Sequence, residues 1–155
     1  MALTMTVKAI AALPKGRITP ERGIAQEEFL QVVRTNVAGP AVVSQVCLPF
    51  LEKGEKKVIV HITSTDDSLQ SVSRVGAGYT SYCMSKAALN MLALKQKSER
   101  SDLRHYYHFV PGTDMDPNND LDPVESVVGI LEVLSSLSTE DSGKFLSDDG
   151  SVIPW

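Results

Sequence analysis

The sequence has few cysteines, and neither of them falls in a recognisable metal-binding or redox spacing. Cys47 and Cys83 lie far apart in segments with a helical pattern, which argues against a disulfide scaffold and against a zinc module. We expect buried free thiols rather than a disulfide pair, because free cysteine is commonly buried. Free thiols are typical of a reducing compartment, so we predict a cytoplasmic protein.

Long apolar runs and clusters of basic residues are also missing. No segment reaches the roughly 20 apolar residues that a membrane-spanning helix needs. Residues 1–13 are interrupted by Lys8 and lack a clear signal-peptide pattern, so we predict a strand or a helix start there. The net charge is −4, with acids and bases interspersed. Nucleic acids and anionic membranes attract clustered Lys and Arg, so we predict neither as a partner.

The sequence does contain an alternation of helix and strand patterns. Its 155 residues suit one domain. Residues 13–23 hold two prolines and two glycines and predict a loop. Apolar residues then recur at three- and four-residue steps over residues 26–50, which predicts a helix that Gly39 and Pro40 bend. Residues 79–97 predict a second helix.

Two compact apolar segments, residues 58–62 and 106–110, predict buried parallel strands. Residues 63–78 between the first strand and the second helix predict a long irregular loop, and residues 144–146 a short last strand. Pro123 suits the first turn of a third helix. The expected apolar face of that helix consists of Val127, Val128, Leu131, Leu134 and Leu137. This alternation predicts an α/β fold with a mostly parallel sheet.

Tyr82 and Lys86 form the strongest candidate pair for chemistry. They are four residues apart on a predicted helix, so their side chains share one face. The pKa of a free phenol is about 10, which makes it a poor acid or base near neutrality. A neighbouring ammonium favours the phenolate and so makes proton exchange with a substrate hydroxyl or carbonyl feasible. The alternative explanation of this spacing is chance or packing on the protein surface.

Polar residues follow both predicted strands. Ser64 comes just after the first strand, where its hydroxyl could bond a substrate oxygen, and Ser68 in the same loop is a competitor. Pro111 and Gly112 follow the second strand and should open on the same sheet edge, where Thr113 and the neighbouring Asp114 could reach a ligand amide or phosphate. Ligands of open α/β sheets bind outside the carboxyl ends of strands. Plain turns are the alternative.

Asn36 and the histidines complete the candidates. Asn36 lies within a predicted helix, where asparagine is not favoured, and could mark a kink with a polar lining. Taken alone, it would be interpreted as a surface asparagine. A metal site built from His61, His105 and His108 is a weaker alternative, because no cysteine or acid completes a ligand set.

Together these pieces resemble the short-chain dehydrogenases/reductases (SDR) over residues 24–155. The matching segments are TNVAG at 35–39, VIVHITS at 58–64, YCMSKAA at 82–88 and PGTDM at 111–115. The closing segments SGKFL at 142–146 and GSVIPW at 150–155 are similar to those of a subgroup of small fungal and bacterial members. The resemblance implies a Rossmann-like, doubly wound fold and hydride transfer between NAD or NADP and a carbonyl or alcohol.

The resemblance also implies residue roles. Tyr82 would be the general acid/base, and Lys86 would tune Tyr82 and bond the nicotinamide ribose. Ser64 would orient the substrate oxygen, and Asn36 would hold a water that links to Lys86. Pro111, Gly112 and Thr113 would form the cofactor loop, with Thr113 touching the nicotinamide carboxamide. The helices around Asn36 and Tyr82 would form the face of a homo-oligomer.

The family's glycine-rich turn, Gly-x-x-x-Gly-x-Gly, does not occur in this sequence. That turn lets backbone amides approach the cofactor's pyrophosphate. We therefore expect one domain, residues 1–155, that is a truncated form of the family fold, lacking the N-terminal βαβ cofactor unit. Residues 1–23 match the family poorly, and residues 24–155 form its catalytic half. A catalytically inactive remnant, or a subunit that needs a partner to bind cofactor, is the alternative to an active enzyme.

Overall fold

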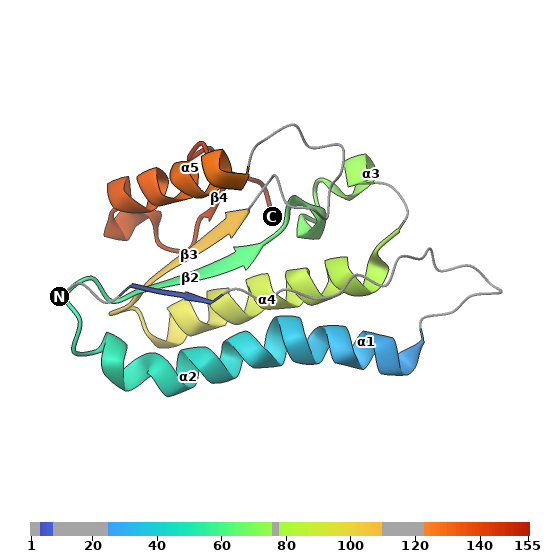
Figure 1. The fold of residues 1–155 in the computed structure, drawn as a ribbon, viewed down its shortest axis with the longest axis horizontal. Helices are drawn as coiled ribbons and strands as arrows, with labels where there is room; N and C mark the ends of the chain where they lie inside the picture. The colour runs from blue at the N-terminus through green and yellow to red at the C-terminus, as the bar shows by residue number, and fades with distance from the viewer. Residues whose placement is uncertain (1–3, 8–24, 76–77, 110–122) are drawn as a thin grey trace.

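The computed structural model describes residues 4–7, 25–75, 78–109 and 123–155, which fold as helices packed on a parallel sheet (Figure 1). The strands are β1 (Thr4–Val7), β2 (Val58–Thr63), β3 (Arg104–Phe109) and β4 (Phe145–Leu146). The α-helices are α1 (Gln26–Val33), α2 (Gly39–Leu51), α3 (Val72–Val75), α4 (Thr80–Glu99) and α5 (Pro123–Ser136). Short turns of helix are η1 (Arg34–Ala38), η2 (Thr65–Asp67) and η3 (Thr139–Asp141).

The sheet has the order β1-β2-β3-β4, and every named pair of strands is parallel. The predicted α/β fold with a parallel sheet is therefore confirmed. Among the described strands, β1 forms one edge of the sheet and pairs with β2 from Thr4 opposite Val58 to Val7 opposite His61. A strand at residues 4–7 agrees with one of the two elements predicted for residues 1–13.

Helices cover the sheet on both faces, with α5 on one side and α1, α2 and α4 on the other (Figure 1). Successive side chains of β2 point to opposite faces, and all six are buried. Val58, Val60 and Ile62 pack against Leu134 and Leu137 on the α5 side. Burial on both faces explains why this strand is a continuous β-branched run in the sequence.

On the opposite face, β2 meets the long helices. Ile59 packs with Leu51 and Leu103, with Leu48 against them. The His61 ring is fully buried, and its Nε2 lies 3.1 Å from the side-chain oxygen of Gln96 on α4. This face of the strand therefore fixes α2 and α4 relative to the carboxyl end of β2.

The helix predicted over residues 26–50 is present, and its bend is a π turn. The backbone N–H of Gly39 donates to the carbonyl of Arg34, five residues back, so η1 is wider than the α-helices on either side of it. Pro40 has no N–H and cannot donate to the carbonyl of Asn36, which is its partner in a regular α-helix. The turn thus departs from regular geometry at Asn36, and such π turns are frequent at functional sites.

Three details of the sequence prediction were wrong. Residues 63–78 are not wholly irregular, because η2 and α3 lie within them. The strand predicted to begin at residue 106 begins at Arg104. The two cysteines are free, as predicted, but partly exposed rather than buried.

The predicted apolar face of α5 was also wrong. Leu134 and Leu137 do face the core, but Val127, Val128 and Leu131 are about half exposed. The helix instead buries a face that includes Ser126, with Gly129 next to the carbonyl of Asp148, where a Cβ would lie 2.8 Å from the oxygen. Small residues allow this close approach, and a count of apolar residues cannot reveal it.

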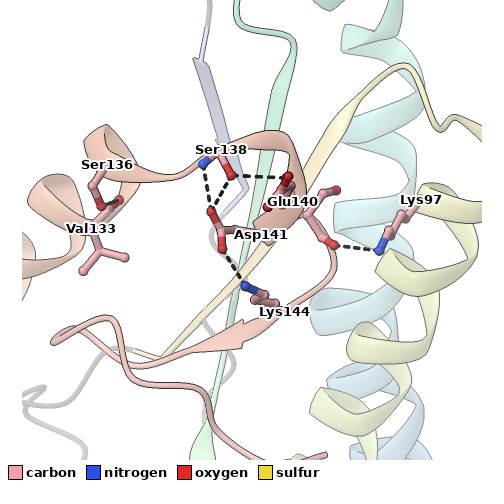
Figure 2. Close-up of polar contacts among 8 residues, drawn as sticks. Lys97, Val133, Ser136, Ser138, Glu140, Asp141 and Lys144 are labelled. Atoms are coloured by element: carbon pink, nitrogen blue, oxygen red, sulfur yellow. Dashed lines mark hydrogen bonds and ion pairs between the residues drawn. The ribbon is translucent and has the colours of Figure 1, made fainter.

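The link from α5 to β4 is held by charged side chains (Figure 2). Asp141 accepts hydrogen bonds from the backbone and hydroxyl of Ser138 and pairs with Lys144 at 2.6 Å. From α4, Lys97 Nζ donates to the carbonyl of Ser142 at 2.6 Å. These contacts fix the start of β4 against α4. Within the described residues, no helix combines the length and apolar character needed to cross a bilayer.

Candidate active site

Ser64 lies directly after β2, at the carboxyl end of the sheet. It is buried, with 7% of its surface exposed. Its backbone N–H donates to the side-chain Oδ2 of Asp67 at 3.1 Å, and its carbonyl accepts from the backbone N–H of Asp67. This reciprocal pair closes η2 tightly and fixes where the chain leaves the strand.

Tyr82 and Lys86 lie in the first two turns of α4, beside the same strand end. Both side chains are buried, which excludes surface packing as the explanation of their spacing. The ammonium of Lys86 is 5.5 Å from the centre of the Tyr82 ring. It also donates to the carbonyl of Ile62 at 2.9 Å, two residues before Ser64. Lys86 therefore joins the tyrosine to the end of β2.

Asn36 is fully buried, so it is not a surface asparagine. Its Nδ2 donates to Ser85 Oγ at 2.9 Å, and Ser85 Oγ donates to the Tyr82 carbonyl at 2.7 Å. These two bonds connect the π turn of one helix to the first turns of α4. The structure thus links Asn36 to the backbone of Tyr82 through a serine that the sequence reasoning did not single out.

The side-chain oxygen of Asn36 is buried together with the rest of the residue. Its Oδ1 has no hydrogen-bond partner in the described part of the chain. Buried polar atoms are nearly always bonded to protein or to ordered water. Asn36 Oδ1 is therefore suited to accept a hydrogen bond from a water molecule.

Ser68, the competing serine, makes different contacts. Its hydroxyl donates to the carbonyl of Pro154 at 2.7 Å and accepts from the backbone N–H of Ser71 at 3.2 Å. The side chain is 2% exposed. Both bonds tie the chain to itself, so Ser68 is a structural residue of this loop and Ser64 is the better candidate for contact with a ligand.

Several predicted residues cannot be placed. Pro111, Gly112 and Thr113 lie outside the described residues, as does the loop predicted for residues 13–23. In the described part, no group of three metal-ligating side chains was found.

Two contributors were missed in the sequence, and each had a weak signal. Ser85 is three residues after Tyr82, so it shares the helix face of that tyrosine. Asp67 is three residues after Ser64, a spacing at which a carboxylate can bond a backbone N–H. Neither signal stands out from chance without the fold.

The arrangement places a phenol, an ammonium and a serine at the carboxyl end of a central parallel strand, where open α/β sheets bind ligands. A phenol can give or take a proton, and a nearby cation favours its ionised form. A hydroxyl can hold a substrate oxygen. The site is therefore equipped for proton transfer to or from an oxygen atom.

Comparisons with known proteins place the chain in a family. A family model described as short chain dehydrogenase matches residues 10–104. A protein named C-signal from Myxococcus xanthus is 35% identical, over 83% of this chain and 81% of its own length. The short-chain dehydrogenase srdF of Neurospora crassa is 26% identical, over 88% of this chain and 59% of its own length.

Solved structures of carbonyl reductases have a similar fold. The NADPH-bound carbonyl reductase from chicken fatty liver is 31% identical, with a TM-score of 0.79, over 94% of this chain and 64% of that chain. The carbonyl reductase Sniffer of D. melanogaster is 24% identical, with a TM-score of 0.85, over 97% of this chain and 65% of that chain. The likeness to Sniffer bears on the fold alone. These neighbours confirm the predicted Rossmann-like fold, and the chain spans less than two thirds of either one.

Proposed function

The chain belongs to the short-chain dehydrogenase family, and from that premise we propose that it interconverts a carbonyl and an alcohol with NAD or NADP. The observation that carries this proposal is the buried Lys86 ammonium, which reaches both the Tyr82 ring and the end of β2. A buried cation is costly unless it is well bonded. Its position between a phenol and a strand end suits proton transfer better than it suits packing.

Tyr82 is the proposed general acid and base. In the direction of reduction, its hydroxyl gives a proton to the substrate oxygen as the carbonyl carbon becomes a carbinol carbon. In the direction of oxidation, the phenolate takes that proton back. Lys86 favours the phenolate through its positive charge and so lowers the cost of losing the proton. Proton transfer of this kind typically contributes about 10²–10⁴-fold to a rate.

Ser64 is proposed to orient the substrate oxygen. Its position after β2 is fixed by the Asp67 bonds, so little freedom is lost when a substrate binds. Asn36 is proposed to hold a water that passes protons between Lys86 and solvent. The buried Oδ1 of Asn36 supports this, because it needs a donor that the described residues do not supply.

The residues present fit the nicotinamide end of the cofactor. Lys86 and Tyr82 would hold the nicotinamide ribose, and Pro111, Gly112 and Thr113 are proposed to line the carboxamide side. The bound nicotinamide would supply or accept the hydride. For the phosphate end the sequence offers no glycine-rich turn. The carbonyl reductase from chicken fatty liver, which is 31% identical, was solved with NADPH.

That missing turn supports a second candidate, a family member without activity of its own or a subunit that binds cofactor only with a partner. Backbone amides at a helix N-terminus are the usual grip on a dinucleotide pyrophosphate. Without them, this chain would bind NAD(P)H weakly or not at all. The two candidates therefore differ most in cofactor affinity.

A titration separates them. NADPH and NADH are added to the full chain, and the emission of Trp155, which is the single tryptophan, is followed together with the thermal midpoint. The enzyme proposal predicts saturation within the roughly micromolar to millimolar range, and consumption of the reduced cofactor with aldehydes or ketones. Absence of binding and turnover across that range would favour the inactive candidate.

A second copy of the chain is the proposed partner of the helical face. Val42, Val46 and Phe50 on α2 are each more than half exposed, and Met84 and Met91 on α4 are also exposed. η1, which leads directly into α2, packs against α4, and the two helices cover the same face of the sheet (Figure 1). Apolar surface of this extent usually marks an interface. A homodimer through α2 and α4 would bury this apolar surface beside the site.

The free cysteines support a cytoplasmic location, because free thiols are typical of a reducing compartment.

A further inference from the structure

Residues 153–155 lie against the loop that follows β2, although about 86 positions of sequence separate the contacts. The backbone N–H of Gln70 donates to the carbonyl of Trp155 at 3.1 Å. The hydroxyl of Ser68 donates to the carbonyl of Pro154 at 2.7 Å. Two carbonyls in succession are thus bonded to one short stretch of the loop.

The other side of this contact is anchored in the core. The indole of Trp155 packs against the ring of Phe145, with centroids 5.4 Å apart and ring planes tilted by 32°. Phe145 is fully buried in β4 and packs with Ala93 of α4 and with Ile153. The backbone N–H of Ile153 donates to the carbonyl of Phe145 at 2.8 Å. The segment is therefore held to β4 by one ring pair and one backbone bond.

A series of short-range hydrogen bonds connects this anchored part of the loop to Ser64. Ser71 donates its backbone N–H to the carbonyl and the hydroxyl of Ser68. Ser68 donates its own N–H to the carbonyl of Thr65, and Asp67 closes on Ser64 at both its backbone groups. Successive hydrogen bonds thus connect Ser64 to Ser71 without a break.

We propose that Trp155 and Ser68 are positioning residues for Ser64, and that the Pro154 and Trp155 carbonyls fix the loop on which the substrate-orienting serine lies. This inference rests on the proposed function. Four named contacts hold the loop to residues 153–155 and these residues to β4: two to the loop and two to Phe145. Without them, η2 would keep its local bonds and its link to β2, but the far side of the loop, from Ser68 to Ser71, would lose its anchor to β4.

The test uses Trp155→Ala, Trp155→Phe and Ser68→Ala in the full chain, with Ser136→Ala as the matched control. Ser136 also donates its hydroxyl to a carbonyl, that of Val133 at 2.8 Å, but on the exposed surface of α5 (Figure 2). Thermal midpoints show that each variant is folded. Amide hydrogen exchange of Gln70 and Ser71 and the kcat and KM of carbonyl reduction are then measured.

The proposal predicts faster exchange at Gln70 and Ser71 in Trp155→Ala and Ser68→Ala. It also predicts that kcat falls about 10- to 100-fold while the KM for the nicotinamide cofactor stays within about twofold, because a misplaced serine spoils alignment rather than cofactor binding. Trp155→Phe keeps a ring on Phe145 and should restore both readouts. Ser136→Ala should match the parent protein.

Two results would overturn the proposal: unchanged exchange in both variants, or faster exchange with kcat unchanged. A parent protein without any turnover refutes the proposed function instead. In that case the exchange of Gln70 and Ser71 still decides whether residues 153–155 hold the loop, so the two failures are distinguishable.

Discussion

The ammonium of Lys86 lies 5.5 Å from the centre of the Tyr82 ring and 2.9 Å from the carbonyl of Ile62. One buried cation thus connects a phenol on α4 with the carboxyl end of β2, two residues before Ser64. Under the proposed function, this is where the proton that accompanies hydride transfer would move.

Lys86→Met tests the charge at this point. Methionine fills the buried volume without the ammonium, so the phenolate of Tyr82 loses its stabilising cation and forms only at higher pH. Turnover near neutrality should fall about 10²–10⁴-fold, and the pH profile of alcohol oxidation should move to higher pH. Lys95→Met, on the exposed side of the same helix, is the control. An unshifted profile in Lys86→Met would remove this lysine from the proton-transfer step.

Ser85→Ala tests the bond between the π turn and α4. Removing the hydroxyl leaves the Asn36 amide without its acceptor in a fully buried position. We expect the free energy of unfolding to drop by about 1–3 kcal/mol, measured by urea denaturation. Ser98→Ala removes an exposed hydroxyl bonded within the same helix and should change stability by less than about 0.5 kcal/mol. Equal effects of the two variants would contradict the bridging role.

Much of this scaffold could be predicted from the sequence, because β2 is a continuous β-branched apolar run bounded by polar residues and such runs alternate with helical segments. The position of Ser64 at the carboxyl end of β2 followed from the strand pattern, whereas its grouping with Tyr82 came from the resemblance to the family. Three features could not be predicted. The π turn is set by the five-residue bond from Gly39 to Arg34, α5 packs through Ser126 and Gly129, and Pro154 meets Ser68 only in the folded chain. The last two are tertiary contacts without a local pattern, and the exact width of a helical turn is not encoded in the apolar spacing.

The pairing of Asp141 with Lys144 predicts an acid-sensitive part of the stability. The hydrogen bond from Lys144 lowers the pKa of Asp141 from 3.8 to about 2. A carboxyl group with a lowered pKa in the folded state stabilises the fold above its unfolded pKa, and this contribution is lost as the pH falls through the folded value. Asp141→Asn should therefore lower the thermal midpoint at pH 5, and the difference from the parent should vanish towards pH 2.

Glu140→Gln is the control for that measurement, since it removes one charge from the same turn and leaves the ion pair intact (Figure 2). Its midpoint should follow the parent across the pH series. A constant difference between Asp141→Asn and the parent from pH 5 to pH 2 would exclude titration of Asp141 as the cause.

The helical face predicts self-association. Val46→Lys places a charge on an exposed apolar position of α2 and should convert a dimer to a monomer in sedimentation velocity experiments. Val124→Lys, at an equally exposed valine on α5, should leave the dimer intact. A parent protein that sediments as a monomer at high concentration, or an equal effect of both substitutions, would refute an interface through α2 and α4.

The most direct measurement is the rate of NAD(P)H-dependent carbonyl reduction by the parent, by Tyr82→Phe and by Tyr79→Phe. Tyr79 precedes α4 and is partly exposed, so its substitution removes a phenol from the same region but not from the Lys86 pair. We predict that Tyr82→Phe loses at least about 100-fold in kcat, whereas Tyr79→Phe stays within about twofold of the parent. A Tyr82→Phe protein that turns over as fast as the parent would contradict the proposed proton-transfer site.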